Sequence, residues 1–107
     1  MPWSTPHGHR FTSAAILTNV PKQPGVYGLY GGEGWVFIGK ADNLQQTLFQ
    51  CLDKRRQYFW PNEPDAFTFE LCPVEESHQR QGELILEFYP LRNHLPEAGP
   101  ARMQKAG

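Results

Sequence analysis

The sequence lacks an excess of charge of either sign. Its 107 residues carry 10 Lys and Arg against 11 Asp and Glu, which gives a formal net charge of -1 at pH 7. Such a chain has no overall field that would draw it to DNA or to an anionic membrane. Any contact with nucleic acid must therefore come from a local cluster of cations.

Cysteines and long apolar runs are also scarce. The two cysteines, Cys51 and Cys72, match neither the paired spacing of a metal site nor a dense disulfide framework, so we expect two reduced thiols. Residues 1–10 contain no apolar run that resembles a signal peptide, and no later run approaches the ~18 apolar residues that span a bilayer. These absences exclude a membrane partner and predict a soluble, cytoplasmic protein.

The length and composition fit one small domain. With 39% hydrophobic residues, the chain can fill one modest core but not two. Proline, glycine and histidine are frequent near the N-terminus, and we expect residues 1–11 to be disordered. Residues 12–93 then form a single domain, and residues 94–107 form a flexible tail.

Hydrophobic periodicity and turn residues divide this domain into helices and strands. Runs rich in β-branched and aromatic residues indicate strands, and apolar residues at i, i+4, i+7 and i+8 indicate a helix. Proline and glycine mark the turns between them. The pattern predicts a short helix at 12–19, a β-hairpin of strands 25–30 and 35–39, a helix from 43 to the cations at 54–56, a loop at 57–65, a strand at 67–71 and a helix at 75–89.

Alternation within the hairpin predicts which side chains share a face. In the second strand, Trp35 and Phe37 fall on one face, while Val36 and Ile38 point the other way, toward the core. We expect Tyr27 of the first strand to face Phe37 across the hairpin.

Two short motifs lie in this hairpin. They are Pro24-Gly25-Val26-Tyr27 and Phe37-Ile38-Gly39-Lys40-Ala41. Together with the later Leu84-Ile85 and Asn93, they resemble the GIY-YIG nuclease family, and most closely the small domain at the start of bacterial excision-repair nuclease subunits. The resemblance covers residues 14–93. It implies an α+β fold with a small three-stranded antiparallel sheet flanked by helices, in agreement with the predicted order of elements.

The resemblance also implies a chemistry. Phosphodiester hydrolysis requires an activated water, a cation that neutralises the phosphate, and donors aimed at the oxygens where charge accumulates. In this family a tyrosine of the first motif is the general base, a glutamate of the last helix holds a divalent metal, and an arginine after the second motif steadies the phosphate. Tyr27 matches that tyrosine, Lys40 matches an assisting lysine, and Asn93 matches the asparagine that closes the pattern.

Three family positions carry a different residue. Phe37 replaces the second tyrosine and lacks its hydroxyl, Thr47 replaces the arginine, and Gln81 replaces the metal-binding glutamate. Because Mg²⁺ prefers anionic oxygen ligands, a neutral amide is a poor substitute. Glu83 lies about 200° round the helix from residue 81, so we expect it at the surface instead. We therefore expect no metal and no cofactor, with Mg²⁺ required only if cleavage survives.

A second candidate site is Lys54-Arg55-Arg56-Gln57-Tyr58-Phe59-Trp60, in which three cations precede three aromatic residues. In one interpretation, Lys40, Lys54, Arg55 and Arg56 contact the phosphates of branched or single-stranded DNA while the aromatic rings stack on bases. In the alternative, the cations stabilise a helix C-terminus and the aromatic rings fill the space under a loop.

Three functions remain open. The first is a degenerate GIY-YIG domain, inactive or strongly impaired in cleavage, that binds nucleic acid or a protein partner. The second is an active metal-dependent DNA endonuclease with a non-standard site. The third is a protein-interaction module without a nucleic-acid role, anchored by an exposed Trp60 or Trp35. The departures at Phe37, Thr47 and Gln81 favour the first, because each removes a group that supports catalysis.

Overall fold

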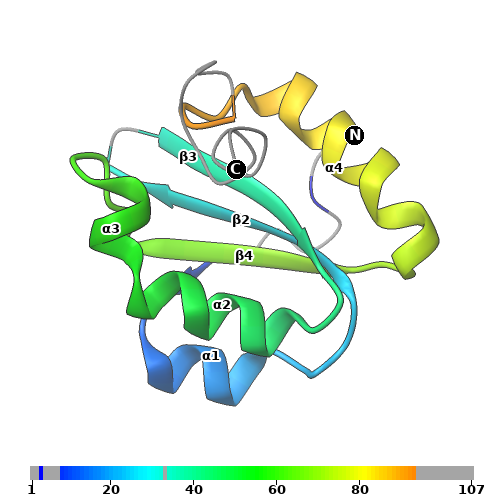
Figure 1. The fold of residues 1–107 in the computed structure, drawn as a ribbon, viewed down its shortest axis with the longest axis horizontal. Helices are drawn as coiled ribbons and strands as arrows, with labels where there is room; N and C mark the ends of the chain where they lie inside the picture. Colours follow the sequence, from blue (N-terminus) through cyan, green and yellow to red (C-terminus); the bar gives the residue numbers. More distant parts are fainter. Residues whose placement is uncertain (1–2, 4–7, 33, 94–107) are drawn as a thin grey trace, which may run out of the picture.

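The computed structural model describes residues 3, 8–32 and 34–93 and shows a sheet between two layers of helices (Figure 1). The strands are β1 (His9–Arg10), β2 (Gly25–Gly31), β3 (Gly34–Ala41) and β4 (Ala66–Leu71). They lie in the order β1-β4-β2-β3, and every neighbouring pair is antiparallel. The helices are α1 (Ser13–Asn19), α2 (Leu44–Asp53), α3 (Arg55–Phe59) and α4 (Val74–Phe88). The predicted α+β class and the predicted hairpin are confirmed.

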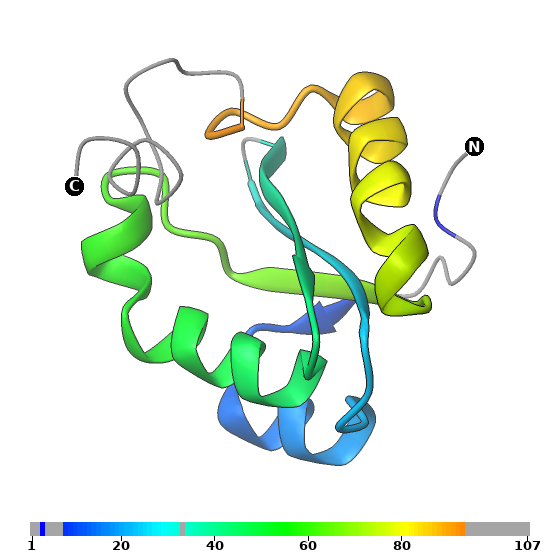
Figure 2. The ribbon, with the colours of Figure 1, turned by 45° about the vertical axis from the view of Figure 1, so that its right-hand side comes forward.

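Helices cover both faces of the sheet. α1, α2 and α3 lie on one face and α4 lies on the other (Figure 2). Each layer of helices packs on its own apolar cluster. The fully buried Leu48 and Phe67 belong to the cluster under α1, α2 and α3, and the fully buried Ile38 and Leu84 belong to the cluster under α4. No helix in the described part of the chain is long and apolar enough to cross a membrane.

The N-terminal segment contradicts the prediction of disorder over residues 1–11 wherever the structure describes it. β1 pairs with β4 and adds a fourth strand to the three that were predicted. Phe11 is 5% exposed and Trp3 is 9% exposed, and the Trp3 ring stacks on Trp35 with 5.7 Å between centroids. Burial of these large rings offsets the entropy lost when the segment is ordered. The predicted tail at 94–107 lies outside the described residues.

The polar residues before α1 and α2 begin these helices as expected. Thr12 and Asn43 each accept a hydrogen bond from the backbone N–H three residues further on, at 3.2 and 3.0 Å. α3, by contrast, overlaps the loop predicted at 57–65, so that prediction was wrong at its start. The reason is Phe59, which is 3% exposed and holds this short helix against the sheet.

A β-bulge in the hairpin changes the predicted pattern of faces. Leu29 pairs with Phe37 and Tyr30 pairs with Trp35, so Val36 is an additional residue in β3. Trp35 therefore packs below α4, whereas Val36 and Phe37 pack with the cluster of α1, α2 and α3. The prediction that Trp35 and Phe37 share a face was wrong, because the strict alternation of a strand fails at a bulge.

The last described residues run back along the free edge of β3. The N–H of Leu91 donates to the Trp35 carbonyl at 3.0 Å, and the N–H of Arg92 donates to the Val36 carbonyl at 2.8 Å. This pairing protects an edge strand that would otherwise present open N–H and C=O groups. It also brings Asn93 to the middle of β3.

Candidate functional site

The aromatic side chains of the two motifs lie together on the α2 side of the sheet. Tyr27 on β2 is 5% exposed, and its ring centroid lies 6.1 Å from that of Phe37 on β3. The Phe37 ring lies 5.9 Å from the Phe59 ring of α3. Tyr27 and Phe37 therefore face each other, as predicted. The phenylalanine at position 37 is part of an apolar contact that reaches from the hairpin to α3.

Gly39 leaves room for these rings. A Cβ atom placed on Gly39 would lie 2.5 Å from the hydroxyl oxygen of Tyr27 and 2.8 Å from a ring carbon of Phe37. Both distances are well below the ~3.5 Å at which non-bonded heavy atoms pack. The glycine of the second motif is therefore required by the close approach of its neighbours.

The hydroxyl of Tyr27 is buried beside a thiol. Its oxygen lies 3.7 Å from Cys51 Sγ on α2. Burial, with a smaller effect from Cys51, raises the pKa of Tyr27 well above its usual range. Burial also raises the pKa of the Cys51 thiol, although its hydrogen bond with Tyr27 opposes the shift. A buried, neutral phenol is poorly suited to take a proton from water.

Two side-chain amides meet at the backbone of Ile38 on the free edge of β3. The N–H of Ile38 donates to Asn93 Oδ1 at 2.7 Å, and Asn93 Nδ2 donates to the Ile38 carbonyl at 3.0 Å. Gln81 on α4 donates to the same carbonyl from Nε2, also at 3.0 Å. The structure thus brings Gln81 and Asn93 together, and both tie the sheet edge to α4 and the turn that follows it.

The donor set at this edge does not suit a divalent cation. Gln81 directs an N–H group at the Ile38 carbonyl, and its neutral amide is a weak ligand for Mg²⁺. Glu83 lies on the exposed side of α4, as predicted, and pairs with Arg80 at 3.1 Å. Across residues 3, 8–32 and 34–93, no group of three or more His, Cys, Asp or Glu side chains is arranged to hold a metal ion.

An ion pair that the sequence did not indicate joins α4 to β4. Arg80 donates from Nε and Nη2 to the two carboxylate oxygens of Glu70, at 2.7 and 2.9 Å. The side chains are only 14% and 13% exposed. The hydrogen bonds with Glu70 raise the pKa of Arg80 above its ordinary value. This ion pair anchors α4 to β4 at Arg80, the residue before Gln81. It thereby positions the Gln81 amide to reach the Ile38 carbonyl.

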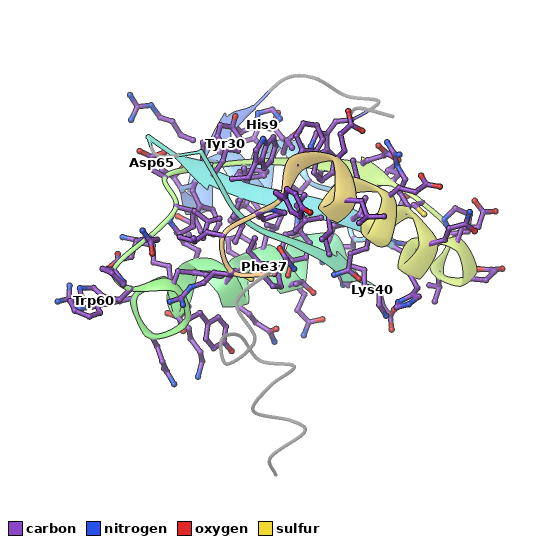
Figure 3. All side chains as sticks on the ribbon, turned by 90° about the horizontal axis from the view of Figure 1, so that it is seen from above. His9, Tyr30, Phe37, Lys40, Trp60 and Asp65 are labelled. Atoms are coloured by element: carbon purple, nitrogen blue, oxygen red, sulfur yellow. The ribbon has the colours of Figure 1, made fainter. Side chains whose placement is uncertain are left out.

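Lys40 and Thr47 lie outside these contacts. Lys40 is exposed and pairs with Val26 near the end of β3, beyond Phe37 (Figure 3). Thr47 is half-buried on α2, and its side chain forms no hydrogen bond within the described part of the chain. The six family positions therefore form one aromatic pair and one amide pair, with Lys40 and Thr47 in neither.

The basic segment lies at the junction of α2 and α3. Its three cations, residues 54–56, are exposed, and Arg55 Nε lies 3.8 Å from Glu63 Oε1. The aromatic residues that follow separate into different environments. Phe59 is 3% exposed, whereas Trp60 is 60% exposed. The alternative in which the aromatic rings fill the space under a loop does not fit Trp60, which is exposed. Phe59 is buried, but it lies on α3 in the main apolar cluster and not under a loop.

Comparison with known proteins shows what the chain resembles. No family model matches it. UvrABC system protein C of Aliivibrio fischeri is 34% identical over 94 residues, which cover 81% of this chain and 14% of that protein. UvrABC system protein C of a Hydrogenobaculum species is 30% identical over 86 residues, which cover 78% of this chain and 14% of that protein. The chain thus spans about a seventh of the length of these relatives.

Solved structures with a similar fold come from Thermotoga maritima. The N-terminal GIY-YIG endonuclease domain of its UvrC, bound to its catalytic divalent cation, magnesium, has a TM-score of 0.62 and 22% identity, covering 74% of this chain and 92% of that one. The chain folds as a GIY-YIG domain. A point mutant of the UvrC domain with phenylalanine in place of a tyrosine, also bound to its catalytic divalent cation, has a TM-score of 0.62, 23% identity and the same coverage.

Two contacts of this GIY-YIG domain were missed by reasoning from the sequence. The first is the contact of Cys51 with Tyr27: the sequence indicated only a reduced thiol, although the seven-residue spacing of Cys51 from Leu44 places it on the helix face toward the sheet. The second contact is the meeting of Gln81 and Asn93 at Ile38. No local pattern signals it, because it depends on how α4 is placed over β3.

Proposed function

We propose that this GIY-YIG domain binds nucleic acid in a role related to DNA repair and has lost efficient cleavage. The observation that carries the proposal is the hydrogen bond from Gln81 to the Ile38 carbonyl, beside Asn93. At the position where the family places a metal-binding carboxylate, this chain has an amide that stabilises the edge of β3. An ionised carboxylate accepts hydrogen bonds only and could not make this contact.

The other departures support impaired chemistry. Phe37 is committed to an apolar contact with Phe59, and the hydroxyl of Tyr27 is buried against Cys51. Thr47 carries no charge for a phosphate. Removing one preorganised stabilising group typically costs ~10²–10³ in rate. Such losses are not additive, but several together leave little catalysis. Mg²⁺ would then matter only to a form that cleaves.

Nucleic-acid binding is supported by the relatives and by the basic segment. UvrC of Thermotoga maritima carries this fold as an endonuclease domain. Here the exposed cations at 54–56, with Lys40, offer phosphate contacts. With a formal net charge of -1 for the whole chain, such binding must be local and sensitive to salt. A role in repair of bacterial DNA would place the protein in the cytoplasm.

Fluorescence anisotropy with labelled branched and single-stranded DNA at low salt tests the proposal. We expect binding that weakens as salt rises and is lost on combined substitution of residues 54–56 by alanine. Lys22→Ala is the control, because Lys22 is an exposed cation near the opposite end of α2, which is about 15 Å long. In parallel samples with Mg²⁺ or Mn²⁺, the DNA should stay intact.

Two outcomes would overturn the proposal. Absence of binding to any nucleic acid would leave a protein-interaction module. Cleavage that is lost in Tyr27→Phe would establish an active endonuclease with a non-standard site, whereas cleavage that persists in that variant would come from a contaminating enzyme and would leave the proposal standing.

A further inference from the structure

Trp60 presents a large apolar ring to solvent. Its exposure of 60% contrasts with 9% for Trp3, and tryptophan is usually well buried. The side chain stands at the rim of the molecule, away from the sheet (Figure 3). The packing of the domain therefore does not explain why this position carries the largest aromatic side chain.

The backbone of Trp60 is held in place on both sides. Its N–H donates to the Arg56 carbonyl at 3.1 Å, and its carbonyl accepts from Arg92 Nη2 at 2.9 Å. The preceding residue, Phe59, is buried and packs on Phe37. An exposed ring on a fixed backbone loses little conformational entropy when it binds a flat ligand.

Three cations precede Trp60 in the chain, in and just before α3, but nearby carboxylates offset part of their charge. Lys54 and Arg56 are exposed and form no ion pair with the residues that the structure describes. Arg55 lies near Glu63, and Asp53 lines the same surface groove. Because two carboxylates lie among these three cations, few positive charges remain for phosphates. Electrostatic attraction alone therefore gives weak binding of nucleic acid. Additional affinity has to come from the exposed ring.

We propose that Trp60 stacks on an unpaired base while Lys54 and Arg56 contact the neighbouring phosphates, so that the domain prefers single-stranded nucleic acid to a duplex. This inference rests on the proposed function and adds the form of nucleic acid that is bound. The bases of a duplex are already stacked on each other and offer a free face only at the ends. One stack of a base on an aromatic ring changes affinity by about 5- to 150-fold.

The experiment compares a labelled oligothymidylate of about 15 nucleotides, the corresponding oligouridylate, and a duplex of the same length. We expect the single strands to bind at least about fivefold tighter than the duplex and to quench tryptophan fluorescence. Two phosphate contacts give a slope of log affinity against log salt of about -1.4. Equal binding of the DNA and RNA strands would show that stacking and phosphates suffice, and a difference would show that the 2′-hydroxyl is also sensed; both outcomes support the proposal.

Variants of Trp60 separate this inference from the proposed function. Trp60→Ala should lose the preference for single strands and the quenching, and Trp60→Phe should keep part of the affinity. Leu86→Ala is the matched control, since Leu86 is a 75% exposed apolar residue on α4, across the sheet. If Trp60→Ala binds single strands as tightly as the wild type while Lys54→Ala and Arg56→Ala weaken binding, the inference is wrong and the proposed function stands. If no nucleic acid binds, both are wrong, and Trp60 serves a protein partner.

Discussion

Replacing Asn93 by Asp changes one atom at the edge of β3 and tests the role of this side chain. In the wild type, Asn93 Oδ1 accepts from the Ile38 N–H at 2.7 Å and Nδ2 donates to the Ile38 carbonyl at 3.0 Å. An aspartate keeps the first hydrogen bond but places a carboxylate oxygen against a carbonyl oxygen. Loss of one hydrogen bond, together with the poorly compensated charge, should cost about 2 to 3 kcal/mol of folding free energy at pH 7.

The cost of this substitution should depend on pH. A protonated carboxyl can donate to the Ile38 carbonyl, whereas an ionised one cannot. The introduced carboxyl therefore has a raised pKa in the folded state. The stability that the protonated carboxyl of the variant adds to the fold is fully present below the unfolded pKa of about 3.9. It is lost as pH rises through the folded pKa of this carboxyl. The difference between variant and wild type should be small near pH 4 and reach its full value at pH 7.

Urea unfolding followed by far-UV circular dichroism, at pH 4 and pH 7, measures both effects. Asn19→Asp is a matched control, because Asn19 Nδ2 also donates to a backbone carbonyl, that of Ala15 at 2.9 Å, but at an exposed site. The control should lose about 1 kcal/mol or less. A loss below about 0.5 kcal/mol for Asn93→Asp at pH 7, or the same loss at both pH values, would refute the role of Asn93 as a clamp on Ile38.

Three further predictions concern Tyr27, Arg80 and Gly39. The pKa of Tyr27 is raised in the folded state, so the neutral phenol stabilises the fold fully below about pH 10. Above about pH 10 this stabilisation is lost, at up to about 1.4 kcal/mol of unfolding free energy per pH unit. Tyr27→Phe should lack this part of the alkaline loss in urea titrations, and an unchanged pH profile would contradict the burial of the hydroxyl. Arg80→Ala removes both hydrogen bonds to Glu70 and should lower the free energy of unfolding by about 2 to 3 kcal/mol. Glu83→Gln, at a side chain that is 47% exposed, should lower it by only about 0.5 kcal/mol. Equal losses in chemical denaturation would contradict the buried geometry of the Arg80–Glu70 pair. Gly39→Ala drives a methyl group into the Tyr27 ring and should cost about 1 to 3 kcal/mol in thermal melts, so a neutral result would show that the rings are not closely packed.

Local sequence signals were enough to predict the hairpin and the residues at which α1 and α2 begin. The valine, isoleucine and aromatic residues around Tyr27 and Phe37 favour strands, and Asn43 has the side chain that a helix N-cap needs. The bulge at Val36 could not be predicted, because it depends on the register with the partner strand. β1 was missed because two residues carry almost no pattern, and its pairing with β4 brings together residues more than fifty positions apart.

The family resemblance predicted which residues belong to the candidate site, but it did not predict the contacts that they make. The resemblance indicated that residues 81 and 93 belong to one site. It did not indicate that Gln81 and Asn93 would both bind the Ile38 carbonyl, since that depends on the placement of α4 over β3. In the same way, the basic segment was visible in the sequence. The separation of buried Phe59 from exposed Trp60 required the structure of α3.

We propose above that this GIY-YIG domain binds nucleic acid without cutting it efficiently. The most direct test incubates labelled branched DNA with an excess of the purified protein in Mg²⁺ and in Mn²⁺, and measures the bound and the cleaved fractions in the same samples. We expect DNA that is bound and remains intact. Cleavage of the bound DNA by the wild type that disappears in Tyr27→Phe would contradict it.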